Sequence, residues 1–273
     1  MVSDWTTGEG LRQGAALSEC ADRSTSGVGR ALPLRLGAVR YWRKIKPFLL
    51  PAPSAIWEQL RVNKSGIWQT AINTGTNAVI GLVVGVLVGL VVAFVAQRYE
   101  IARALIAPLG AALNTMPIVA LGPVFYNLFG STSDTARRVV IGLVAFFPVF
   151  VNTLRGLTQV DPIHTELMRS YAASEGAFLR LVRVPNALGF TVTGIRIAAS
   201  LSVIAAVVVE YFGGLQNGLG SRAASAMKLS ATAKGWAYVA AACALGLCFY
   251  FFAVILERLA MPWQARRRAA DRA

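Results

Sequence analysis

Residues 65–97 read SGIWQTAINTGTNAVIGLVVGVLVGLVVAFVAQ and contain no Asp, Glu, Lys or Arg. About twenty apolar residues cross the hydrocarbon of a bilayer as a helix, because every backbone polar group must be satisfied within the segment. The stretch is long enough for one such helix, near 71–97. Further apolar runs predict spans near 104–129, 137–155, 188–212 and 236–260. The predicted fold is an all-α polytopic membrane protein with five transmembrane helices.

The composition agrees with a membrane protein. Of 273 residues, 55% are hydrophobic and 15% charged, and the mean hydropathy is +0.55. A net charge of +14 would suggest nucleic acid in a soluble protein. Lys and Arg accumulate in cytoplasmic loops of membrane proteins, so we expect the lipid bilayer, and no nucleic acid, as the partner. The three cysteines, Cys20, Cys243 and Cys248, form neither a disulfide framework nor metal-ligand spacing, and no metal is expected.

The first predicted span carries Gly81, Gly85 and Gly89, a doubled small-xxx-small pattern. This spacing places three glycines on one helix face, where another backbone can approach closely. We predict a role in helix packing, although glycine is also simply common in membrane helices.

The second predicted span is interrupted by Pro108, Pro117 and Pro123. Irregular backbone is tolerated in a membrane where it lines a cavity or is buried in protein, so this segment is the candidate wall of a translocation path. Kinks selected for helix packing are the alternative. The path candidates are Asn114, Thr115, Met116, Pro117 and Asn127, with Asn152 in the third span.

Loop charges predict the topology. The region from Arg155 to Arg183 is rich in Arg and should be cytoplasmic, together with the basic C-terminal tail. Parity then places Arg137 and Arg138 outside, against the usual bias. Within the fourth predicted span, Arg196 and Glu210 lie towards the two ends and are expected to be interfacial.

Between the third and fourth spans lies a polar, basic segment, residues 166–185, ELMRSYAASEGAFLRLVRVP. Asp161 and Pro162 form a helix start, and apolar residues then recur every three or four positions. Gly176 is expected to permit a break and Pro185 to stop the pattern before the next span. Two short helices are therefore predicted to form a docking surface at the membrane face. His164, also in this loop, has no partners at metal-ligand spacing.

This segment resembles the cytoplasmic loop of permease subunits of ATP-binding-cassette importers, whose pattern is E-A-A-x3-G-x9-I-x-L-P. Glu166 falls on the Glu, Ala172 replaces the Gly, and Val184–Pro185 stand for Leu–Pro. Other motifs that resemble the family occur along the chain in the same order as in the family. They are Phe48-Leu49-Leu50-Pro51-Ala52-Pro53-Ser54, Phe147–Pro148, Val160-Asp161-Pro162, Gly194-Ile195-Arg196 and Glu210 with Gly218-Leu219-Gly220. The resemblance covers about residues 45–262. The resemblance is strongest to the nitrate, sulfonate, taurine and thiamine-precursor branch.

The resemblance implies a multi-pass protein of the bacterial inner membrane that forms the path for a small polar solute. The implied partners are a separate ATPase subunit that holds ATP and Mg²⁺, an extracytoplasmic substrate-binding protein, and a second permease copy, with a homodimer expected. The implied coupling helix, about Ser170–Phe178, would enter a groove on the ATPase. The implied coupling residues are Glu166, Ser170, Tyr171, Ala172, Ala173, Ser174, Glu175, Gly176, Phe178 and Pro185.

The N-terminus departs from this family, whose members usually have a sixth span before the Phe-Leu-Leu-Pro segment. Residues 1–44 are polar and Arg-rich, and we expect them to be disordered. Either the protein has five spans or this segment does not represent the natural N-terminus. The expected organisation is 1–44 as this segment, 45–262 as the transmembrane domain and 263–273 as a basic cytoplasmic tail.

Two other functions remain alternatives. No G-x4-G-K-[ST] pattern occurs, so the chain itself is not expected to be an enzyme or to hold a cofactor. A secondary transporter driven by an ion gradient would need acids at the midplane and an inverted repeat, and neither is visible. An intramembrane enzyme would need a base beside Ser200 or Ser202. The solute itself cannot be read from the sequence.

Overall fold

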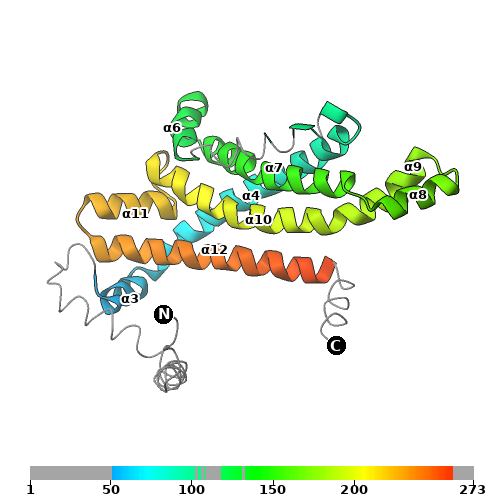
Figure 1. Cartoon of the computed structure of the whole chain (residues 1–273). Helices are drawn as coiled ribbons and strands as arrows, with labels where there is room; N and C mark the ends of the chain where they lie inside the picture. The colour runs from blue at the N-terminus through cyan, green and yellow to red at the C-terminus, as the bar shows by residue number, and fades with distance from the viewer. Residues whose placement is uncertain (1–50, 102–103, 106–107, 109–117, 131–132, 261–273) are drawn as a thin grey trace, which may run out of the picture.

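The computed structural model describes residues 51–101, 104–105, 108, 118–130 and 133–260, and the regular elements among them are all helices (Figure 1). Four helices are long and apolar enough to cross a membrane. They confirm the predicted spans near 71–97, 137–155, 188–212 and 236–260. These helices are α4 (Lys64–Ala96), α7 (Thr135–Thr158), α10 (Val184–Phe212) and α12 (Thr232–Ala260).

The predicted span near 104–129 is described only in part. Its last portion is α6 (Ile118–Phe129), a short apolar helix that contains Pro123. Most of residues 102–117 lie outside the described residues. The all-α, multi-pass class is therefore confirmed, and the count of five spans agrees only approximately with the described helices.

Helix α7 is the centre of the bundle and packs mainly against α4 and α10. Gly81, Gly85 and Gly89 of α4 are buried against α7. A Cβ atom on Gly85 would lie 2.5 Å from the carbonyl oxygen of Gly142, so only glycine allows this approach. Helix α10 also approaches α7 closely, since a Cβ atom on Gly194 would lie 2.7 Å from the carbonyl oxygen of Pro148. The small residues thus bring three backbones together.

The remaining elements surround one end of the bundle. Helix α3 (Pro53–Val62) packs on α12, and α11 (Leu219–Lys228) packs on α12 and α10. A buried apolar cluster joins these elements and includes Ile67, Leu219 and Tyr238. The outer face of α12 is apolar and exposed, as expected for a surface that meets lipid or another membrane subunit.

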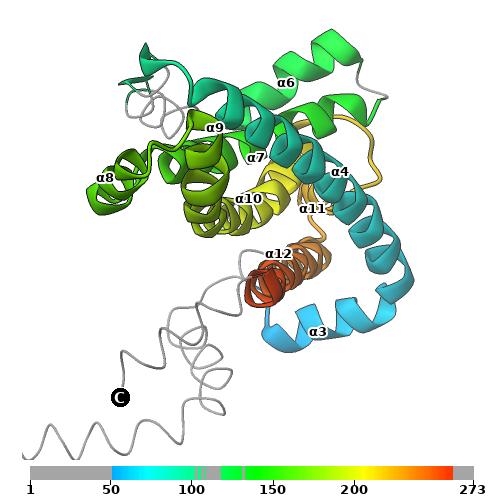
Figure 2. The ribbon, with the colours of Figure 1, turned by 90° about the vertical axis from the view of Figure 1, so that its right-hand side faces the viewer.

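The opposite end is formed by the connection between α7 and α10. It consists of α8 (Pro162–Ser170), α9 (Glu175–Phe178) and a π-helix, η1 (Leu179–Arg183). Helix α8 projects beyond the long helices in both views (Figures 1 and 2). Helices α7 and α10 run antiparallel, so they join this projecting connection to the end that carries α6 and α11 (Figure 1).

Candidate functional site

The start of α8 is the predicted one. The Asp161 carboxylate accepts a hydrogen bond from the Ile163 N–H at 2.9 Å, and Pro162 occupies the first turn. Both features favour a helix that begins at this point.

The break within the connection lies at residues 171–174 rather than at Gly176. Ala172 has a left-handed φ of +47°, and the Ala173 N–H donates to the carbonyl oxygen of Met168 at 3.1 Å. The Ser174 hydroxyl then accepts from the Ala177 N–H at 3.3 Å and caps α9. This cap starts α9 before Gly176, so the prediction of a break at Gly176 was wrong. Ala172 occupies the turn, the position of the glycine in the family pattern.

Pro185 does not end the helix, contrary to the prediction. α9, η1 and α10 form one continuous helical segment, residues 175–212, with Pro185 in the first turn of α10. Proline lacks an N–H and disturbs the turn before it. The five residues of π-helix directly before Pro185 accommodate this irregularity without interrupting the segment.

The apolar stripe predicted for this region divides into an outward and an inward part. Ile163, Leu167 and Tyr171 are 69%, 49% and 75% exposed. Phe178 is buried, and the guanidinium of Arg183 lies 4.7 Å from the centre of its ring. Phe178 thus packs against η1, which leads into α10, while the three residues of α8 and its C-cap face outwards.

The predicted coupling residues share this one projecting connection. Most are exposed, Ala173 is half-buried, and the Ser170 hydroxyl donates to the carbonyl oxygen of Leu167 at 2.7 Å. Glu175 forms an ion pair with Arg183 at 3.9 Å. The exposed members are Glu166, Ser170, Tyr171, Ala172, Ser174, Glu175, Gly176 and, at the start of α10, Pro185.

The predicted path residues are described only in part. Asn114, Thr115, Met116 and Pro117 lie outside the described residues. Asn127 is exposed on α6, whereas Asn152 is half-buried on α7 and its side-chain amide donates to the carbonyl oxygen of Pro148 at 2.7 Å. These two asparagines lie on different helices, and they do not define a path by themselves.

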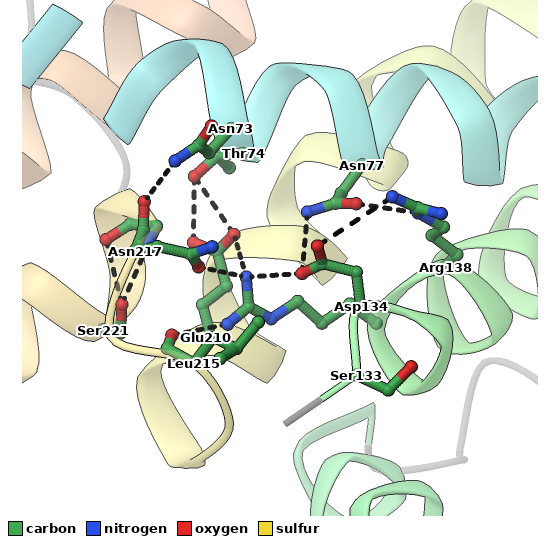
Figure 3. A network of polar contacts seen from close by, with 12 residues as sticks. Asn73, Thr74, Asn77, Ser133, Asp134, Arg138, Glu210, Leu215, Asn217 and Ser221 are labelled. Carbon is green, nitrogen blue, oxygen red and sulfur yellow. Dashed lines mark hydrogen bonds and ion pairs between the residues drawn. The ribbon is translucent and has the colours of Figure 1, made fainter. Parts of the chain in front are cut away.

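Sequence reasoning missed a buried polar network at the opposite end of the α7–α10 pair. At its centre is Arg137, whose side chain is fully buried. The guanidinium lies 3.2 Å from the Asp134 carboxylate and 3.7 Å from the Glu210 carboxylate. It also donates to the Asn217 side-chain oxygen at 2.8 Å and to the carbonyl oxygen of Leu215. Figure 3 shows these residues around the guanidinium.

Glu210 is buried in protein instead of exposed at an interface. Its residue exposure is 1%, and both carboxylate oxygens accept from the Thr74 hydroxyl, at 3.1 and 3.0 Å. Arg196 is also paired, since its guanidinium lies 2.9 Å from the Glu257 carboxylate of α12. The position of both residues at the membrane interface stays a prediction. Their pairing was not foreseen, because each partner lies far away in the sequence.

The same network accounts for the two adjacent arginines, Arg137 and Arg138, at the start of α7. Arg138 donates to the Asn77 side chain at 2.9 Å and lies 3.9 Å from the Asp134 carboxylate. Two arginines therefore face two carboxylates, from Asp134 and Glu210, and their charges balance. The expected topology puts Arg137 and Arg138 on the side where positive charge is unfavourable, and this was the one sequence signal that pointed to such a pairing.

Together, the spans and the projecting helical connection define a polytopic α-helical membrane subunit with one face open to a partner. The chain belongs to the family described as binding-protein-dependent transport system inner membrane component, whose model matches residues 67–261. It is thus a permease subunit of an ATP-binding-cassette importer in the inner membrane. A transporter of this family comprises a separate ATPase and a binding protein.

Similar proteins of known name are transport permeases. The riboflavin transport system permease protein of Chloroflexus aurantiacus is 32% identical, over 80% of this chain and 81% of the relative. The formylaminopyrimidine transport permease protein of Halalkalibacterium halodurans is 28% identical, over 81% and 88%. The taurine permease of Escherichia coli is 26% identical, over 80% and 82%.

Solved structures share the fold. An amino acid ABC transporter chain superposes with a TM-score of 0.58 at 17% identity, covering 73% of this chain and 96% of that one. A chain of the MetNI methionine ABC transporter, in inward-facing conformations, gives 0.51 at 21% identity, covering 76% and 98%.

Proposed function

We propose that the α8–α9 connection, residues 162–178, is the coupling segment through which a separate ATPase drives this permease. One observation carries the proposal: Ile163, Leu167 and Tyr171 form an exposed apolar stripe on a segment that projects from the bundle. Residues spaced by four lie on one helix face. Such a face fits a hydrophobic groove on a partner, which is the helix-in-groove mode of recognition.

Charged residues surround the stripe and would set the orientation of docking. Glu166 and Arg169 are exposed on α8. A charged rim around an apolar centre gives specificity and speeds association, while the apolar contacts supply most of the affinity. We expect Glu166 to meet a basic residue of the ATPase, and ATP and Mg²⁺ to be held entirely by that partner.

The proposed membrane orientation follows from the Arg-rich connection, which places α8 and α9 in the cytoplasm. Helix α10 has 29 residues and is thus about 43 Å long, enough to cross the bilayer. Its C-terminal end, with Glu210 and α11, would face outwards, where a binding protein delivers solute.

We further propose a homodimer around a shared path for a small polar organic solute. The exposed apolar faces of α4 and α12 leave room for a second copy in the membrane. The relatives named above transport riboflavin, a formylaminopyrimidine and taurine, which are all small and polar. The path candidates remain the residues of 114–117 with Asn127 and Asn152.

A charge on the stripe tests the coupling proposal. The variant Leu167→Glu should abolish co-purification of the ATPase with a tagged permease while the permease still folds. Leu229→Glu, at a leucine between α11 and α12 that is 80% exposed against 49% for Leu167, is the control and should retain the ATPase. Normal co-purification with Leu167→Glu would contradict the proposal.

A further inference from the structure

We propose that Arg137, Glu210 and Thr74 are positioning residues that fix the loop 213–218 to the α7–α10 pair. Movement imposed at α8–α9 would then reach the outer end of the permease through this fixed loop. The inference rests on the proposed function, because it assigns α8–α9 as the end that the ATPase moves. Arg137, Glu210 and Thr74 are the residues through which the movement would reach the loop 213–218.

The Arg137 guanidinium alone joins several elements. It donates to Asn217 and Leu215 of the loop and lies 3.7 Å from the carboxylate of Glu210, near the end of α10. Its Nε also donates to the Tyr126 hydroxyl of α6 at 3.3 Å. Arginine presents donors in a fixed planar fork, so its contacts set the loop position in more than one direction.

Thr74 closes the network from the side of α4. Its hydroxyl lies within hydrogen-bond distance of both Glu210 oxygens and accepts from the Leu219 N–H at 2.9 Å. The Gly220 N–H donates to the Glu210 carboxylate at 3.1 Å. The start of α11, directly after the loop, is therefore held by the same two side chains.

The loop is fitted to this network without spare room. Gly214 has a φ of +82°, and a Cβ on it would overlap the Tyr126 ring. A Cβ on Gly218 would overlap the Glu210 carboxylate. Closely packed contacts of this kind have discrete arrangements rather than a continuous range, so the loop must move with its support or detach from it.

We expect α7 and α10 to move as one body, because they pack along each other and are joined by side-chain contacts. The Thr153 and Thr191 hydroxyls are 3.0 Å apart, and the Asn186 side chain donates to the carbonyl oxygen of Gly156 at 2.7 Å. Both contacts lie in the half of the pair next to α8 and α9. The pair thus connects the coupling segment to Arg137 and Glu210 through continuous packing.

The test measures whether nucleotide at the ATPase changes the exposure of the loop. Gln216 is exposed, so Gln216→Cys, in a background in which Cys20, Cys243 and Cys248 are serine, reports the loop to a membrane-impermeant maleimide. The permease is purified with its own ATPase, and labelling is compared without nucleotide and after trapping with ATP and orthovanadate. We expect the labelling rate to differ at least about fivefold between the two states. Equal rates would overturn the proposal.

The decisive variant is the double substitution Arg137→Met with Glu210→Gln. Removing both charges leaves neither uncompensated, so assembly with the ATPase is expected to survive. The nucleotide-dependent change in labelling should nevertheless disappear, because the loop has lost its anchor. If the double variant assembles and its labelling still changes with nucleotide, Arg137 and Glu210 have only a structural role. That result would overturn the proposal.

A milder pair of variants covers the case in which the double variant does not assemble. Thr74→Val keeps the shape of the side chain but removes the hydroxyl, and Thr74→Ser keeps the hydroxyl. We expect Thr74→Val to reduce the labelling change and Thr74→Ser to retain it. Equal behaviour of the two would overturn the proposal. ATPase co-purification, measured on the same samples, reports separately on the coupling segment.

Discussion

The two ends of the α7–α10 pair differ in how their polar and apolar groups are satisfied. At the α8–α9 end, the side chains of Ile163, Leu167 and Tyr171 are exposed, as is Leu181 of η1, and no described residue covers them. At the α11 end, Arg137 and Glu210 are fully buried and matched within the chain. The first end presents an apolar stripe to a partner, whereas the buried charged groups of the second end are satisfied within the chain. A change at the first end should therefore alter assembly, and a change at the second should alter folding.

The largest expected effect is on folding at the Arg137 end. Arg137→Met leaves Glu210 as a buried charge without its partner, which costs about 3–5 kcal/mol of folding stability. Arg138→Met is the matched control, because the Arg138 side chain is 41% exposed and its ion pair is worth about 1 kcal/mol or less. Thermal unfolding of the purified permease measures both, and equal melting temperatures would contradict the buried network.

The next largest expected effect is on folding stability at the contact between α4 and α7. Gly85→Ala forces the helices apart, because the added Cβ would lie 2.5 Å from the Gly142 oxygen. Overpacking of this kind costs about 1–3 kcal/mol. Gly66→Ala in the same helix meets nothing within 4 Å and should stabilise slightly. Thermal stability should rank Gly66→Ala above the parent and Gly85→Ala below it, and the reverse order would refute the packing described above.

Tyr171→Ala should change the affinity for the ATPase without changing folding stability, which distinguishes the α8–α9 end from the α11 end. Its side chain is 75% exposed, so the loss should change stability by no more than about 0.5 kcal/mol. If Tyr171 anchors the ATPase, affinity should fall at least about tenfold. Titration of detergent-solubilised permease with the ATPase measures this change. Unchanged affinity would remove Tyr171 from the coupling surface.

The smallest effect lies at the turn between α8 and α9. Ala172 has a φ of +47°, a conformation that costs a residue other than glycine about 1–2 kcal/mol. Ala172→Gly should relieve part of this cost and slow local opening, seen as slower amide hydrogen exchange in residues 168–178. Ala173→Gly is the control and should speed exchange, since Ala173 has no such φ. Faster exchange in Ala172→Gly would contradict the strained turn.

The sequence predicted the long helices because uncharged runs and helical length are local properties. It also placed the start of α8, since the Asp161 cap and Pro162 are adjacent in the chain. The break at residues 171–174 was missed because Ser174, whose hydroxyl accepts the capping hydrogen bond, is a weaker sequence signal than the more conspicuous Gly176. The prediction that Pro185 ends the helix failed because its effect depends on the π-helix before it. A π-helix has no recognised sequence pattern.

The buried network could not be predicted because its members come from distant segments. Thr74, Arg137 and Glu210 are brought together only by the packing of α4, α7 and α10. Glu210 alone suggested a membrane-interface position, and Arg137 alone suggested a loop outside the membrane. What the sequence did contain was an imbalance of charge: the expected topology puts two arginines on the disfavoured side of the membrane, and their pairing with carboxylates accounts for it.

The central claim is that the α8 stripe is covered by the ATPase in the assembled transporter. Ile163→Cys, in the background without native cysteines, places a reactive thiol on this stripe, and its maleimide labelling rate can be compared in the complex and after the ATPase has been stripped. The account predicts labelling at least about tenfold slower in the complex, as expected for a residue at the centre of an interface. Equal labelling in both samples would show that the stripe remains open and that the ATPase binds elsewhere.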